Sequence, residues 1–215
     1  MPPVFTAAFK MPPSIKSLDL SGASLAVVSG WLSQAEKLKA VTKITLSRAA
    51  VDDRALDALK NLPALCEINL AEAKLPPATL ERLGQMKSLQ RIDLSAQKLD
   101  TKALTALAQL PKLKALSANY ARFSGVDLAK LSNLETLNAA LSSLTDADVK
   151  SLSKLTKLQR LDISGTSIGD KSAVSLGQMP SLAKIIIQSA KFSEAGRKKL
   201  WDTGSAHRLT EMQGD

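Results

Sequence analysis

Apolar residues recur along this chain with a fixed spacing. The pattern apolar-x-x-apolar-x-apolar-x-x-small-x-apolar begins at Ile15, Val41, Leu65, Leu89, Leu113, Leu134, Leu158 and Leu182. Successive starts are separated by 26, 24, 24, 24, 21, 24 and 24 residues. A period in this range is typical of a solenoid, in which each unit buries its apolar side against its neighbours. The eight units therefore predict one structural domain.

Each unit predicts one strand and one helix. Counted from the first apolar residue of a unit, positions 4 and 6 are apolar and positions 3, 5 and 7 are mostly polar, as around Ile92 and Leu94. This alternation predicts a strand with one buried face. Further apolar residues precede most unit starts by nine, six and three residues, as Leu104, Leu107 and Leu110 do, and this spacing predicts a helical stripe.

Strand followed by helix, repeated in one direction, predicts a parallel sheet. Strands stack about 4.8 Å apart and helices about 10 Å apart, so the stack should bend with the sheet inside. The expected fold class is α/β: a right-handed curved solenoid, with the parallel sheet on its concave face and helices on its convex face. The fifth unit is three residues short, and Ser124-Gly125 replace the start of its helix, so a single turn or a loop is expected there.

The spacing resembles that of the leucine-rich repeat family, whose members include ribonuclease-inhibitor-like solenoids, and the resemblance covers roughly residues 15–192. The stretch LDISGTSIGD at 161–170 is similar to the 24-residue repeats common in bacterial proteins, which implies a bacterial origin. Many family members carry Asn at position 9 of the repeat. This chain instead has Ala23, Ala49, Ala73, Gln97, Ala121, Ser142, Thr166 and Ala190 there. We therefore expect water, hydroxyl groups or a different turn to satisfy the backbone groups that an Asn ladder would bond.

Three segments are expected along the chain: an N-terminal cap (1–14), the eight repeats (15–192), and a C-terminal capping helix and tail (193–215). Open solenoid ends must be covered. Val4, Phe5 and Phe9 are expected to cover the first unit, and Ser193 to cap a last helix over 194–201. The tail that carries His207 is expected to be loose.

Composition and charge restrict the class of protein. Lys and Arg number 29 against 20 Asp and Glu, a net charge of +9 that favours acidic partners or anionic surfaces. The single cysteine, Cys66, forbids an internal disulfide. No apolar run is long enough to predict a membrane span. If Met1 is the natural start, the protein is expected in the cytoplasm; if a signal peptide preceded it, the protein is exported. We expect a monomer.

Residues with catalytic chemistry are scarce. With one histidine and one cysteine far apart in the sequence, neither a metal cluster nor a nucleophile–base pair is expected. No phosphate-binding glycine motif is present. Residues 165–169 match G-x-S-x-G, but they occupy positions 8–12 of an ordinary repeat, with Ile168 in an apolar slot. The sequence therefore predicts no enzyme activity, no cofactor and no metal.

Two sets of residues are candidates for a binding site. The first is a basic rim at position 10, where Lys74, Lys98 and Arg122 follow one another in neighbouring units, with Arg48 in the unit before. The second lies on the strands, where an Arg-x-Asp pair occurs twice. Its members are Arg91 with Asp93 and Arg160 with Asp162, and Tyr120 is the one aromatic residue expected near this face. Both sets also fit an ordinary solvated surface.

The resemblance implies a non-enzymatic scaffold that binds a protein partner through the concave face and the basic rim, and the charge implies an acidic surface on that partner. A polyanion- or RNA-binding module driven by the positive charge is the alternative. Binding of nucleic acid is less favoured, because the inner face offers few aromatic residues for base stacking.

Overall fold

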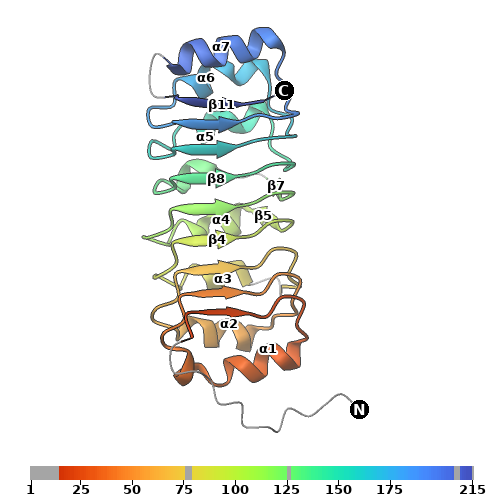
Figure 1. Cartoon of the computed structure of the whole chain (residues 1–215), viewed down its shortest axis with the longest axis vertical. Helices are drawn as coiled ribbons and strands as arrows, with labels where there is room; N and C mark the ends of the chain where they lie inside the picture. Colours follow the sequence, from red (N-terminus) through yellow and green to blue (C-terminus); the bar gives the residue numbers. More distant parts are fainter. Residues whose placement is uncertain (1–14, 76–78, 125–126, 206–208, 215) are drawn as a thin grey trace.

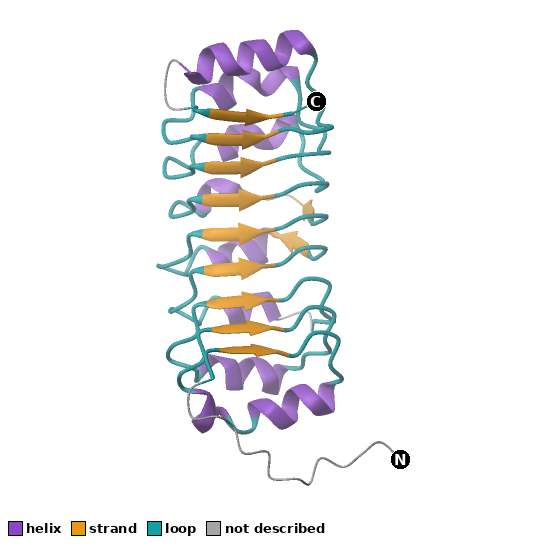
Figure 2. Cartoon of the chain, viewed as in Figure 1, coloured by secondary structure: helices purple, strands orange, loops and turns teal. Residues whose placement is uncertain are grey.

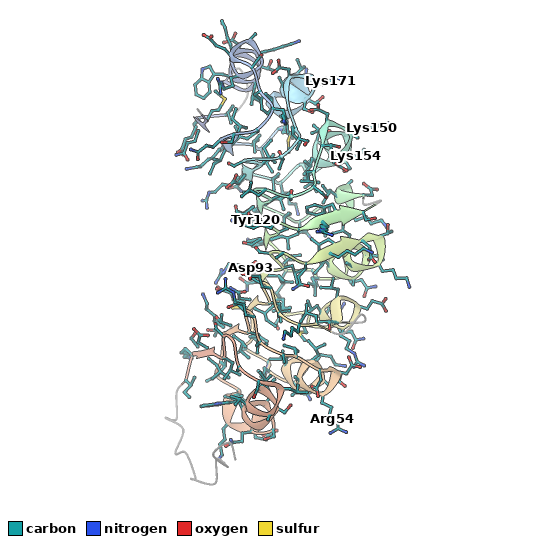
Figure 3. All side chains as sticks on the ribbon, turned by 90° about the vertical axis from the view of Figure 1, so that its right-hand side faces the viewer. Arg54, Asp93, Tyr120, Lys150, Lys154 and Lys171 are labelled. Carbon is teal, nitrogen blue, oxygen red and sulfur yellow. The ribbon has the colours of Figure 1, made fainter. Side chains whose placement is uncertain are left out.

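The computed structural model describes residues 15–75, 79–124, 127–205 and 209–214 as one elongated stack (Figure 1). The strands form a single layer and the helices lie behind it (Figure 2). Viewed from the side, the stack bows toward the sheet, so the sheet lines the inner face (Figure 3). The predicted α/β solenoid is confirmed. The expected N-terminal cap with Val4, Phe5 and Phe9 lies outside the described residues, as does His207.

The main sheet is parallel throughout and follows the chain order. Its strands are β1 Ser17–Asp19, β2 Lys43–Thr45, β3 Glu67–Asn69, β4 Arg91–Asp93, β6 Ala115–Ser117, β8 Thr136–Asn138, β9 Arg160–Asp162, β10 Lys184–Ile186 and β11 Glu211–Gln213. Each strand covers positions 3 to 5 of its unit, and equal positions face one another, as Ile92 faces Ile68. A second small sheet pairs β5 (Lys98–Asp100) with β7 (Arg122–Ser124) past the strand ends.

The C-terminal tail differs from the expectation. The chain returns after the last helix and adds β11 beside β10, which gives the main sheet nine strands rather than eight. Leu209 is buried and Met212 packs against the core. These two residues repeat the first two apolar positions of a unit, so residues 209–214 form a partial ninth repeat and are not loose as expected.

The helices vary in length along the stack. They are α1 Leu25–Leu32, α2 Asp53–Lys60, α3 Thr79–Leu83, α4 Thr101–Leu107, α5 Val149–Leu152, α6 Ala173–Gly177 and α7 Glu194–Ser205, with short 3-10 turns at η1 Ala35–Leu38, η2 Leu128–Lys130, η3 Asp146–Asp148 and η4 Asp170–Ser172. Among its described residues, the fifth unit has only η2 in place of a helix, as its length predicted. Ser193 caps α7, because its hydroxyl accepts a hydrogen bond from the Gly196 N–H at 3.1 Å.

The core is aliphatic and lies between the two layers. Positions 4 and 6 are buried in the middle of the stack, with Leu94 and Leu137 fully buried. Side chains of the helical stripe meet them from the other layer, and Leu104 and Leu107 are fully buried as well. Each unit therefore completes the core of its neighbours, which makes the units thermodynamically dependent on one another.

The turn after each strand has a left-handed residue at position 8. These residues are Gly22, Arg48, Glu72, Ala96, Tyr120, Leu141, Gly165 and Ser189, with φ between 54° and 67°. The backbone N–H at position 8 donates to the position-7 carbonyl of the next unit, for example from Tyr120 to Ala140 at 2.9 Å. The left-handed conformation follows from the turn, and residues other than Gly adopt it at a cost of about 1–2 kcal/mol.

Position 9 lacks the asparagine ladder that many leucine-rich repeats carry, and two units replace it with their own side chains. Gln97 donates from Nε2 to the carbonyls of Leu70 and Ala73, at 3.2 and 3.0 Å. The buried Thr166 hydroxyl donates to the Ile163 carbonyl at 2.6 Å. The expectation that other groups satisfy these turns is therefore confirmed in these two units.

Candidate functional site

The start of the strands carries a charged triad at position 3. Glu67 lies between two cations on the neighbouring strands, with Oε1 at 2.5 Å from Lys43 Nζ and Oε2 at 2.7 Å from Arg91 Nε. Partial burial disfavours the charged carboxylate, but hydrogen bonds from Lys43 and Arg91 outweigh it and lower the pKa of Glu67. The hydrogen bonds and charge of Glu67 raise the pKa of Arg91. Arg91 is therefore held by Glu67 and is not a free anchor.

Asp93 and Asp162 do not pair with Arg91 and Arg160, which corrects the interpretation of the Arg-x-Asp motif. Each aspartate accepts the backbone N–H two residues further along, from Ser95 or Ser164, at 2.9 Å. The reason is geometric. Position 3 of the next strand is about 4.8 Å away, whereas position 5 of the same strand is about 6.6 Å away. Arg91 therefore reaches Glu67 first, and the aspartates stabilise the turns.

Arg48 lies at position 8, where it forms an ion pair. Its Nε and Nη2 donate to the two carboxylate oxygens of Glu72 at 3.1 and 2.9 Å. The hydrogen bonds from Arg48 lower the pKa of Glu72. Both side chains are exposed, so the pair is worth little for stability. The structure thus separates Arg48 from the other predicted rim cations, because a carboxylate of the next unit already neutralises it.

Lys74, Lys98 and Arg122 form the row that their common position predicted, and we call these three residues the basic rim. Lys98 and Arg122 face each other in the register of β5 and β7, and Lys74 pairs with Ala50 on the side toward the N-terminus. All three side chains are exposed. Within the described part of the chain, none of them forms an ion pair with a carboxylate. The three positive charges are therefore left to solvent within the described residues.

Tyr120 is the most exposed large apolar side chain of the inner side, with 62% of its surface exposed. It lies on the sheet side together with Asp93, opposite Lys150, Lys154 and Lys171 on the helix side (Figure 3). Leu141 is the equivalent residue of the next unit, and it is 52% exposed. Sequence reasoning missed Leu141. The signal that could have found it is a leucine at position 8, where Gly22 and Gly165 stand in other units.

Arg160 and Lys184 complete the C-terminal half of position 3. Arg160 is exposed and has no ion-pair partner among the residues that the structure describes. Lys184 binds Glu211 of β11 at 2.7 Å, a contact that exists only because the tail forms a strand. Arg160 is therefore the one predicted strand arginine that remains available, and it lies at the opposite end of the strands from the basic rim.

Two kinds of catalytic site can be checked among the described residues, a metal cluster and the G-x-S-x-G match. No group of three or more His, Cys, Asp or Glu side chains there could hold a metal ion. Ser167 pairs with Thr145 of the preceding unit in an ordinary inter-unit bridge, and its N–H donates to the Leu144 carbonyl. A polar hollow of about 260 Å³ lies among Asp127, Ala147, Asp148, Lys150, Ser151 and Lys154.

None of the described helices has the length and apolar character needed to cross a membrane.

Comparison with known proteins finds similar folds among solved structures. No protein-family model matches the sequence, and no curated protein sequence matches it. Internalin C2 of Listeria monocytogenes is 22% identical, with a TM-score of 0.58 over 84% of this chain and 74% of that one. Internalin F of the same organism is 20% identical, with a TM-score of 0.59 over 93% and 67%. A Bacteroides fragilis protein is 17% identical, with a TM-score of 0.63 over 94% and 66%. The structure of TLR13 with a single-stranded RNA is 16% identical, with a TM-score of 0.50 over 94% and 36%. At these identities the likeness shows the fold that the repeat predicted.

Proposed function

We propose that this chain, which has the leucine-rich-repeat fold, is a non-enzymatic module that binds a protein partner through its inner face and the basic rim. The observation that carries the proposal is the row of Lys74, Lys98 and Arg122, three exposed cations on adjacent turns with no carboxylate against them among the described residues. Stacked like charges are stabilised when an anionic surface lies against them. An acidic face on the partner provides that compensation.

The inner face supports a protein ligand better than a small molecule. Its outward positions carry small polar side chains such as Ser95, Ser117 and Asn138, which give a shallow surface rather than a deep pocket. The backbone of this surface is held by hydrogen bonds between units along the strands and the turns that follow them, which restrains it. A restrained surface lowers the ordering cost of binding.

A polyanion or RNA is the second candidate ligand. The net charge of +9 favours it, and so does the fold likeness to TLR13, which was solved with a single-stranded RNA. Against it, Tyr120 is the only tyrosine of the chain, and the inner positions offer no row of aromatic side chains among the described residues. Binding of single-stranded nucleic acid relies on such stacking platforms.

Charge reversal of the basic rim tests the proposal. The variant K74E/K98E/R122E should fold as the wild type does and should lose most of its capture of the native partner from a host lysate, identified by mass spectrometry. The matched control K150E/K154E/K171E reverses three exposed lysines on the helix side and should keep capture.

Two results would overturn the assignment. Unchanged capture by the rim variant would remove the rim from the site. Tight binding to generic RNA, with a steep loss of affinity as salt rises, would favour the polyanion candidate, because each neutralised phosphate adds to the salt dependence. A protein partner should show a shallower dependence.

A further inference from the structure

Tyr120 and Leu141 stand out among the exposed apolar residues of the solenoid. The described part of the chain has five large apolar side chains that are well exposed, and three of them, Leu25, Val27 and Trp201, lie on the first or last helix. Ends of a solenoid expose apolar surface because no further unit covers them. Tyr120 and Leu141 lie in the fifth and sixth units, so the end of the stack does not account for their exposure.

The two residues also lie on adjacent turns. Tyr120 donates its N–H to the Ala140 carbonyl, and Leu141 repeats this contact to Ser164, so the two residues occupy equivalent places on adjacent turns. Both adopt left-handed backbone conformations, with φ of 57° and 56°. The first and seventh units carry glycine at this position. The turn therefore accepts Gly, and large apolar side chains at these two places do not serve the fold.

The Leu141 side chain lies over Gly165 of the next unit. A Cβ added to Gly165 would lie 2.5 Å from Leu141 Cδ2 and 3.1 Å from its Cγ, so the Leu141 side chain rests on the bare backbone of the next unit. This contact restricts the Leu141 side chain on one side, and a restricted side chain loses less conformational freedom on binding. The absence of a side chain at Gly165 thus leaves the space that the Leu141 side chain occupies.

At position 10, the residues beside this pair are cationic toward the N-terminus and uncharged toward the C-terminus. Arg122 lies two residues after Tyr120 and faces Lys98. Toward the C-terminus the equivalent rim residues are Ser143 and Ser167. The next carboxylate at position 8 is Glu72, which Arg48 already binds. A ligand that covers the pair therefore meets positive charge at the Tyr120 end only.

We propose that Tyr120 and Leu141 form the apolar anchor of the binding surface, and that their occupant is an acidic segment of a protein partner with a bulky apolar side chain beside its carboxylates. This inference rests on the proposed function and deepens it. The apolar side chain of the segment lies between Tyr120 and Leu141, and its carboxylates lie against Arg122 and Lys98. Buried aromatic and arginine residues commonly supply most of the binding energy of an interface.

The test uses a displayed library of random dodecapeptides selected on the immobilised full chain. Enriched peptides should be acidic and should contain Leu, Ile, Phe or Trp. Their Kd, measured by fluorescence anisotropy, should rise roughly tenfold or more on the variant Y120G/L141G. Glycine is the residue that the same chain carries at position 8 in two other units, so this variant should fold. The matched control A96G changes the adjacent position-8 residue and should leave the Kd unchanged.

Several outcomes would overturn the inference, and they differ from those that overturn the proposed function. Peptides that lose binding to K74E/K98E/R122E but not to Y120G/L141G would remove the anchor and leave the rim function standing. The anchor would also be ruled out if the enriched peptides lacked apolar residues, or if no peptide were enriched. Self-association that Y120G/L141G abolishes in sedimentation velocity would identify a second copy as the occupant. Loss of single-stranded RNA binding in this variant would make Tyr120 a stacking platform for RNA.

Discussion

Asp170 accepts two hydrogen bonds from Ser193, one from its N–H at 2.8 Å and one from its hydroxyl at 2.6 Å. Ser193 in turn caps α7 through the Gly196 N–H. The carboxylate of one unit therefore positions the first turn of the helix that closes the stack. The hydrogen bonds from Ser193 lower the pKa of Asp170 below its ordinary value of 3.8.

This contact should make stability depend on pH in the acid range. Because the pKa is lower in the folded chain than in the unfolded chain, the stabilisation is fully present above about pH 4 and is lost as the pH falls through the folded value. Asp170→Asn keeps the shape without the titration. Urea unfolding of both proteins from pH 7 to pH 2.5 should show the wild-type advantage shrinking with acid. A constant difference across this range would contradict the role of Asp170.

Leu141→Gly should leave the free energy of unfolding unchanged or raise it by up to about 1 kcal/mol. Relief of the left-handed strain contributes about 1–2 kcal/mol, and the extra freedom of glycine in the unfolded chain offsets part of it. Leu144→Ala, three residues on and fully buried, should instead lose roughly 2–5 kcal/mol. Thermal and urea unfolding of the two variants compares them. A similar loss of unfolding free energy in both variants would show that the Leu141 side chain stabilises the fold.

Leu94→Asp should cost several kcal/mol and unfold neighbouring units, because it places a charge in a fully buried position that adjacent units share. Asp93→Ala, one residue away, should cost only about 1 kcal/mol, the net value of its hydrogen bond to the Ser95 N–H. Asp93→Asn can keep that bond and should recover most of the loss. Circular dichroism melts of the three variants give the comparison, and equal melting of Leu94→Asp and Asp93→Ala would contradict the register.

Removal of residues 206–215 should lower the free energy of unfolding by at least about 2 kcal/mol, because it exposes the core around the buried Leu209 and breaks the Lys184–Glu211 ion pair. It also opens the edge of β10, and an open strand edge promotes association. Denaturant unfolding and light scattering measure the two effects. A truncated chain as stable and as monodisperse as the full chain would show that β11 contributes nothing to the stack.

The apolar period predicted the strands, their register and the short fifth unit because burial alone determines those features. Leu94 and Leu104 are buried for the reason that their spacing indicates. The sequence did not predict the ninth strand, because residues 209–214 have only two of the apolar positions of a unit, Leu209 and Met212. These follow the eighth unit after an interval longer than the repeat.

The candidate site was less predictable, since it depends on which side chains meet between units. Glu67 and Glu72 neutralise Arg91 and Arg48, and a charge count along one unit does not reveal a partner in the unit beside it. Leu141 was not predicted from the sequence for a different reason. Its exposure follows from the left-handed turn, which apolar periodicity does not record.

The repeated left-handed turn also imposes a spacing on any ligand that lies along the row of position-8 residues. Successive position-8 residues advance with the strands by about 4.8 Å, so two units span about 9.6 Å. A polyproline II chain repeats every three residues over about 9.3 Å, whereas an extended strand alternates its side chains every two residues over about 6.6 Å. The spacing of the position-8 residues therefore matches a ligand whose side chains repeat every three residues. The side chains of a β-strand laid along this row would lose register with the turns within a few units.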